Sequence, residues 1–204
     1  MEQRITQKAQ ELFFRYGTKS VTMDDIASNL GVSKKTIYQY YTDKDSLVDA
    51  VLQKEISQNS AECIRQNASS ENAVHEMFMA MEMMQTTLAA MNPAVIFDMQ
   101  KYHPGPFNKF IEFKNKFLYE MIRNNICRGQ KEEFYREDLN VDILAKFRIE
   151  SIFIGMNPDI FNLSKYSLLQ VEMEIMENFL YGICTPKGQK QLLKYKKQSQ
   201  TTNI

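Results

Sequence analysis

The stretch TMDDIASNLGVSKKTIYQYYTDKDSL, residues 22–47, decides the fold of this chain. Thr22 precedes an acidic turn with Asp25 three positions later, a capping-box pattern that begins a short helix. Gly31 can end that helix because glycine readily adopts the left-handed conformation, and Ser33 can cap a second helix. Two short helices joined by a glycine-containing turn predict a helix-turn-helix.

The second helix of this pair has a polar, cationic and aromatic outer face. At about 100° per residue, Ile37 and Tyr41 fall on the inner side, which faces the first helix of the chain. The outward positions are Lys34, Lys35, Thr36, Tyr38 and Gln39. Lysine reaches phosphate or guanine, glutamine pairs with adenine, and threonine and tyrosine contact thymine methyl groups. The face therefore suits a DNA major groove.

Lys44 is expected in the first turn of the following helix, where free backbone amides also attract anions. We interpret it as a phosphate clamp. The alternative is that Lys34, Lys35 and Lys44 are ordinary solvated surface charges, which is the usual role of isolated lysines.

The surrounding pattern favours the first interpretation. LFFRYG at residues 12–17, followed by residues 22–47, resembles the DNA-binding domain of the TetR family of transcriptional regulators. This chain and the family share, at matching spacings, an aliphatic residue, a Gly, a Thr, the pair Ile-Ala, the run Gly-Val-Ser, a Tyr, a further aromatic residue and a Lys. The resemblance extends over residues 5–52.

The resemblance implies an all-α homodimer. Residues 1–46 would form a three-helix DNA-binding head, and residues 47–204 a helical body for ligand binding and dimerisation. The family's base and phosphate contacts map to Thr22, Lys34, Lys35, Thr36, Tyr38, Gln39, Tyr40 and Lys44. Some members of the family have a basic residue at the position of Asp24. In this chain the Asp24 carboxylate would instead repel a nearby phosphate. Tyr41 matches an aromatic residue that packs inward.

The composition also indicates an all-α protein. Gly (7) and Pro (5) are few, which favours long helices. Apolar periodicity predicts helices at 5–16, 22–30, 33–41, 43–65, 71–91, 107–128, 141–156 and 164–183. We expect a loop at Pro104, Gly105 and Pro106, a helix stop at Gly129 and a break at Pro158.

Charge and cysteine content exclude several classes of protein. Lys plus Arg (25) equals Asp plus Glu (25), so no global positive field attracts DNA or membranes and any DNA binding must be local. The chain shows no signal peptide and no long apolar run, which predicts a cytoplasmic protein without a membrane partner. Three separated cysteines and two histidines fit no catalytic or metal-binding motif. We therefore expect no enzyme, metal or cofactor.

A methionine-rich segment between Met77 and Met99 could line an adaptable apolar cavity, or simply form helical core. The predicted ligand-pocket residues are Phe78, Met81, Phe97, Tyr102, Phe110, Phe113, Phe117 and Phe147. Acids and bases are sparse in these helices, which predicts a small apolar effector.

The helix expected at 164–183 is apolar over a wider arc than a one-sided helix requires. This arc consists of two neighbouring apolar stripes. One stripe would face the core of the monomer, and the other would face a second copy of the chain. The predicted dimer-interface residues are Phe153, Leu168, Ile175 and Phe179. The lysine-rich C-terminal segment could bind an anionic partner, but Leu192, Leu193 and Tyr195 favour a last helix docked on the body.

The sequence thus predicts a ligand-responsive transcriptional repressor that binds a palindromic double-stranded DNA operator as a homodimer. The alternative is a helical module that binds small molecules or proteins and does not recognise a DNA sequence.

Overall fold

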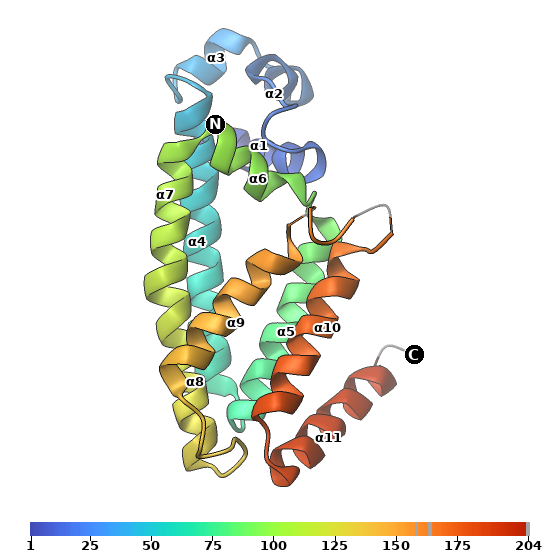
Figure 1. The fold of residues 1–204 in the computed structure, drawn as a ribbon. Helices are drawn as coiled ribbons and strands as arrows, with labels where there is room; N and C mark the ends of the chain where they lie inside the picture. Colours follow the sequence, from blue (N-terminus) through green and yellow to red (C-terminus); the bar gives the residue numbers. More distant parts are fainter. Residues whose placement is uncertain (158, 163–164, 203–204) are drawn as a thin grey trace. The chain divides into compact units, whose positions relative to one another are not determined.

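The computed structural model describes residues 1–157, 159–162 and 165–202. These residues form α-helices and one π-helical segment, and no named strand occurs among them (Figure 1). The helices are α1 (Glu2–Tyr16), α2 (Met23–Leu30), α3 (Lys34–Tyr38), α4 (Lys44–Ser69), α5 (Ala73–Ala90), α6 (Ala94–Tyr102), α7 (Pro104–Phe113), the π-helical η1 (Lys114–Leu118), α8 (Tyr119–Lys131), α9 (Val141–Gly155), α10 (Leu168–Ile183) and α11 (Pro186–Thr202). The all-α prediction is confirmed.

The chain divides into two compact units. Residues 1–60 and 90–113 form unit 1, and residues 61–89 and 114–204 form unit 2. The boundary therefore crosses the chain within α4, at the last residue of α5, and between α7 and η1. The division into a DNA-binding head and a body at residues 46 and 47 concerns function and stays a prediction.

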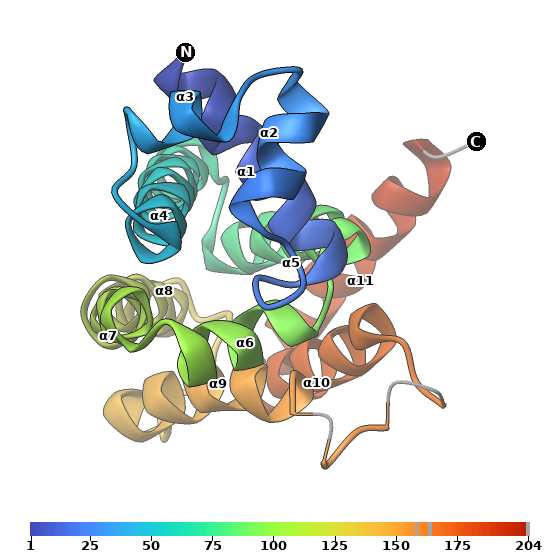
Figure 2. The ribbon, with the colours of Figure 1, turned by 90° about the horizontal axis from the view of Figure 1, so that it is seen from above.

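The core of unit 1 joins the first three helices to the start of α4. Its fully buried members include Ile5, Phe13, Ile26, Ile37 and Leu47. Figure 2 shows α1, α2 and α3 gathered beside the start of α4. Because each of these helices contributes to one apolar cluster, the helix-turn-helix is held by packing as well as by its caps.

The segment from α6 to α7 is attached to the same unit by polar contacts. The Asp98 carboxylate accepts a hydrogen bond from the Lys19 backbone N–H at 2.9 Å. The Asn92 backbone N–H donates to the Phe14 carbonyl. These bonds fix α6 beside α1, as Figure 1 shows.

Pro104, Gly105 and Pro106 do not form the predicted loop. They are the first turn of α7. First-turn amides have no partner within the helix, so proline loses no hydrogen bond there and its φ is already helical. The Phe107 backbone N–H then donates to the His103 carbonyl at 3.0 Å, which closes the turn.

Gly129 does not end a helix either, because α8 continues to Lys131. A Cβ atom at Gly129 would lie 2.0 Å from Cδ2 of the Tyr135 ring. Tyr135 is buried, and its hydroxyl donates to the Ala73 carbonyl at 3.1 Å. The glycine is therefore required by the approach of this ring and not by a turn.

We expect Gly129→Ala to destabilise the fold by about 3 kcal/mol, because the added methyl group displaces a buried tyrosine from its hydrogen bonds. Urea denaturation measures the effect. Gly105→Ala is the matched control: it lies in a helix with nothing within 4 Å of its added Cβ, and should be neutral or slightly stabilising. Equal stability of the two variants would contradict this role of Gly129.

Several helix bounds differ from the sequence prediction. Helix α3 ends at Tyr38 and α4 extends to Ser69. Helix α10 begins at Leu168 because the Ser167 hydroxyl caps it, accepting from the Gln170 N–H at 3.1 Å. The predicted start at Ser164 and the break at Pro158 lie outside the described residues.

The C-terminal helix α11 docks on unit 2 as predicted. Leu192 and Tyr195 are buried in its core, whereas Leu193 is exposed. The Tyr195 hydroxyl accepts from the Asn72 side chain at 2.8 Å, which links α11 to the start of α5.

Candidate nucleic-acid interface and body sites

Local hydrogen bonds build the helix-turn-helix. The Thr22 hydroxyl accepts from the Asp25 N–H at 3.1 Å, and the Asp25 carboxylate accepts from the Thr22 N–H at 2.8 Å. The Thr22 hydroxyl also donates to the Asp25 carboxylate at 2.7 Å, and this bond together with the one from the Thr22 N–H lowers the pKa of Asp25. Gly31 has φ 67°, and the Ser33 hydroxyl accepts from the Thr36 N–H at 3.1 Å. The predicted capping box and turn are both present.

Helix α3 has the predicted inner and outer faces. Ile37 is fully buried, and Tyr41, just after the helix, is buried with its hydroxyl 2.6 Å from the Thr6 hydroxyl. Lys35 and Gln39 are exposed. Tyr38 and Tyr40 are 43% and 44% exposed, so both rings are accessible to a partner.

Lys34 forms an ion pair that the sequence reasoning missed. Its Nζ lies 2.7 Å from Oδ2 of Asp24 on α2, and this hydrogen bond raises the pKa of Lys34. Asp24 therefore competes with a phosphate for Lys34. Because both side chains are exposed, the pair is a weak one that DNA could displace.

The remaining predicted contacts differ in exposure. Thr22 is exposed beside α2, and the half-buried Thr36 places its hydroxyl 2.9 Å from the Ser33 hydroxyl. Lys44 opens α4 but lies back toward α1, with Nζ 3.5 Å from the Lys19 carbonyl. Burial lowers the pKa of Lys44, and the charges of Asp98, Asp45 and Asp25 oppose this effect.

The predicted ligand-pocket residues are divided between the two compact units. Phe97, Tyr102, Phe110 and Phe113 belong to unit 1, and the other four to unit 2. Phe78 and Met81 lie in the core of unit 2, where the Phe78 ring is 5.9 Å from that of Tyr195. Phe147 is the one that lines the groove described next. The pocket stays a prediction.

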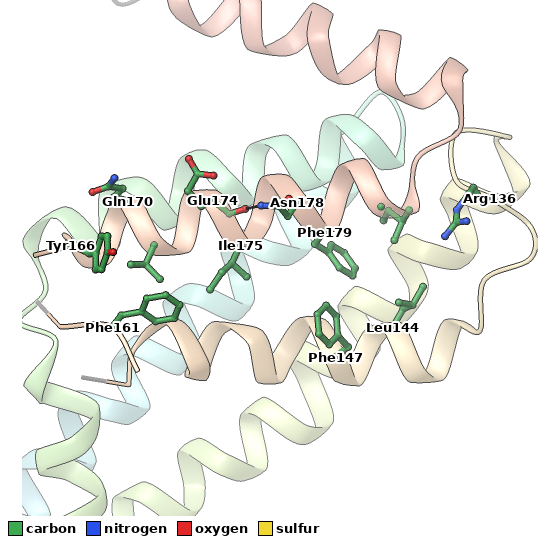
Figure 3. A pocket seen from close by; sticks show the side chains of 13 residues that line it. Arg136, Leu144, Phe147, Phe161, Tyr166, Gln170, Glu174, Ile175, Asn178 and Phe179 are labelled. Atoms are coloured by element: carbon green, nitrogen blue, oxygen red, sulfur yellow. Dashed lines mark hydrogen bonds between the residues drawn. The ribbon is translucent and has the colours of Figure 1, made fainter. Parts of the chain in front are cut away.

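An open, mainly apolar groove of about 760 Å³ runs between α9 and α10. Figure 3 shows Phe147 and Phe179 pointing toward one another, with Phe161 and Ile175 farther along. Polar residues mark its edge and ends: Arg136, Tyr166, Gln170, Glu174 and Asn178.

Of the predicted interface residues, Ile175 and Phe179 line this groove. Leu168 is buried, and the Phe153 ring lies 4.5 Å from the Lys114 ammonium. Phe147 is 54% exposed and Ile143 is 62% exposed on the neighbouring α9. The apolar surface thus extends over both helices.

The two most deeply buried charges described in unit 2 were not predicted. Arg148 on α9 is 3% exposed, and Glu172 on α10 is 0% exposed. Burial lowers the pKa of Arg148 to about 10 and raises the pKa of Glu172 to about 7, while each charge partly offsets the other's shift. Charged residues on amphipathic helices usually face water, so the sequence does not predict a buried Arg148. For Glu172 the one available signal is its position within the wide apolar arc of its helix.

Among the described residues, no group of three or more His, Cys, Asp or Glu side chains could hold a metal ion. Cys63, Cys127 and Cys184 are free thiols. None of the helices in the described part of the chain is long and apolar enough to cross a membrane.

Comparison with known proteins supports a regulatory role. Residues 5–51 match the family described as bacterial regulatory proteins, tetR family. The chain is 27% identical over 161 residues to the HTH-type transcriptional regulator YvaF of Bacillus subtilis, covering 78% of this chain and 83% of that protein. It is 23% identical over 158 residues to the HTH-type transcriptional repressor KstR2 of Mycobacterium tuberculosis, covering 74% and 78%.

The fold is also found in solved structures. A transcriptional regulator from Cytophaga hutchinsonii superposes with a TM-score of 0.67 at 25% sequence identity. The match covers 89% of this chain and 97% of that one. The similarity therefore extends well beyond the helix-turn-helix.

Proposed function

Because its N-terminal helix-turn-helix places this chain in the tetR family of bacterial regulatory proteins, we propose that it is a ligand-responsive repressor that binds a palindromic operator as a homodimer. That it is a DNA-binding transcriptional regulator follows from the family. The observation that carries the proposal is the outer face of α3, where Lys35 and Gln39 are exposed opposite the buried Ile37. A relative named as a repressor supports the direction of regulation.

In this function α3 enters the major groove and its side chains contact base edges. Gln39 can engage adenine, and Lys35 can reach guanine or phosphate. Two copies of α3 in the dimer would lie about 34 to 36 Å apart, one helical turn of DNA, or a multiple of this distance. The operator would therefore be an inverted repeat.

The groove between α9 and α10 is proposed to receive the same surface of a second copy. Phe147 and Ile143 are large apolar side chains that a soluble monomer rarely exposes next to an apolar groove. Figure 3 shows the charged Arg136 at one end of the groove and Glu174 toward the other. If the two-fold axis is perpendicular to the groove, each end meets the opposite end of its partner, which brings groups of opposite charge closer together.

The DNA-binding role is tested by selecting sites from a random double-stranded pool with the purified protein. An enriched inverted repeat that binds far more tightly than its scrambled version is expected. Selection without any enriched site would favour the helical module that does not recognise sequence.

On the selected site, we expect Lys35→Ala or Gln39→Ala to weaken binding about 10- to 100-fold, because each removes a base or phosphate contact. Fluorescence anisotropy at two salt concentrations measures the loss. Lys190→Ala is the control, since Lys190 is an exposed lysine on α11 and does not line the groove between α9 and α10. Unchanged affinity of both α3 variants would remove these residues from the interface.

The proposed effector is a small, largely apolar molecule bound in the helical body. It acts as an inducer if it binds the DNA-incompetent conformation more tightly, with a coupling of about 1 to 3 kcal/mol. Release of the operator on addition of the effector, followed by anisotropy, is the expected behaviour.

A further inference from the structure

The inner face of α9 carries an unusual polar stripe. Arg148, Ser151 and Gly155 are spaced at i, i+3 and i+7, which places them on one side of the helix. All three are buried. Glu172 of α10 packs against the Gly155 end of this stripe, because a Cβ atom on Gly155 would lie 2.2 Å from Glu172 Oε1.

The Glu172 carboxylate has no hydrogen-bond donor. Both of its oxygens are buried and unpartnered among the described residues. A buried carboxylate without a partner is costly, so each such group in a native protein calls for an explanation, such as a functional role or a bound ion. Glycine at position 155 leaves the space that this carboxylate occupies.

Among the described residues, no positive charge lies in hydrogen-bond contact with Glu172. Gly155 is the last residue of α9, and the C-terminal end of a helix carries a partial negative charge. Arg148 lies seven residues earlier, which is about 10 Å along the helix axis. Its Nη1 donates to the Ser151 hydroxyl at 3.1 Å, and its guanidinium lies 6.0 Å from the Phe179 ring.

The site is therefore rich in acceptors, poor in donors and shielded from water. We propose that Glu172 anchors a protonated amine of the small organic effector. An ammonium group supplies both a positive charge and up to three N–H donors. Arg148 acts on Glu172 through its charge and without direct contact, because that charge favours the ionised carboxylate. The inference rests on the ligand-responsive function proposed above.

The test uses the purified full-length chain, thermal unfolding at pH 8 and three probes of equal chain length: hexylamine, hexanol and hexanoate. The variants are Glu172→Gln, which keeps the shape and removes the charge, and Glu120→Gln, an exposed control on α8 that does not line the groove. We expect hexylamine to raise the Tm of the native chain and of the control by about 3 °C near ten times its Kd. The shift is lost in Glu172→Gln, and hexanol and hexanoate give much smaller shifts.

Three outcomes would overturn the amine site: no shift with hexylamine, an equal shift with hexanol, or an equal shift in Glu172→Gln. A second measurement uses the native chain alone. Its hexylamine shift should fall strongly between pH 8 and pH 5, because protonated Glu172 no longer attracts an ammonium group, and a shift unchanged by pH contradicts the proposal.

The effector role is measured separately. If hexylamine binds through Glu172 but leaves operator affinity unchanged, the amine site stands and the ligand-responsive function fails. If hexylamine does not bind while another small molecule releases the operator, the ligand-responsive function stands and the amine site fails.

Discussion

A Phe147→Glu variant is expected to be a folded monomer whose affinity for the selected operator is at least about 100-fold lower than that of the native dimer. Phe147 is more than half exposed in the chain and lines the groove between α9 and α10. A carboxylate there costs little in the monomer because it faces water. In the proposed dimer it would be buried among aromatic side chains without a partner, which disfavours association strongly.

Loss of the dimer also explains the expected loss of DNA binding. A monomer presents one α3 helix to one half-site of the operator. The contacts with the other half-site are therefore no longer made by the same bound molecule, and the affinity falls. Analytical ultracentrifugation measures the oligomeric state and circular dichroism the fold. The variant should keep its helical content.

Ile64→Glu is the matched control for this experiment. Ile64 is an exposed, large apolar residue on α4 that does not line the groove, so its substitution should leave both the dimer and the operator affinity intact. If Phe147→Glu remains dimeric, the interface lies elsewhere. If both variants become monomeric, the effect is not specific to the groove.

Local features of the head could be predicted from the sequence because short-range chemistry determines them. The capping box of Thr22 and Asp25, the left-handed Gly31 and the burial of Ile37 depend on residues within a few positions. The outer face of α3 follows from the helical period alone.

Features that depend on long-range packing could not be predicted in this way. Gly129 has the sequence appearance of a helix stop, but the ring of Tyr135 determines its role. Pro104 and Pro106 are typical of loops, yet they also suit a first helical turn. The choice depends on the chain before and after them.

The charged residues show the same limit. Asp24 and Lys34 lie on different helices, and their ion pair requires the turn between them to be built first. His103 looks like an isolated histidine, but the fold buries it with Nδ1 2.6 Å from Oδ1 of Asp45, which links the start of α7 to α4. Sequence periodicity gives no information about such partners.

The second large effect concerns the pH dependence of stability. In the folded chain burial raises the pKa of Glu172 from its ordinary 4.5 to about 7. The folded state therefore binds this proton more tightly than the unfolded state does. The resulting stability is fully present below about pH 4.5 and is lost as the pH rises through 7, because the buried carboxylate must then ionise without a hydrogen-bond donor.

Between pH 5 and pH 8 the native chain should consequently lose about 3 kcal/mol of stability through this one group. Arg148 does not contribute over this interval, because its pKa of about 10 keeps it protonated throughout. Glu172→Gln has no proton to lose and should be more stable than the native chain at pH 8 by a similar amount. Urea denaturation at a fixed protein concentration, at pH 5, 6, 7 and 8, measures both curves.

Glu120→Gln serves as the reference for surface charge, since Glu120 is an exposed acid on α8 and does not line the groove. Its stability should follow the native curve at every pH. Parallel curves for the native chain and Glu172→Gln would show that Glu172 is already ionised and stabilised by a partner within the fold. A native curve that falls toward pH 8 while the Glu172→Gln curve stays level would establish that the unliganded chain carries a strained buried acid, which is the condition an ammonium group would relieve.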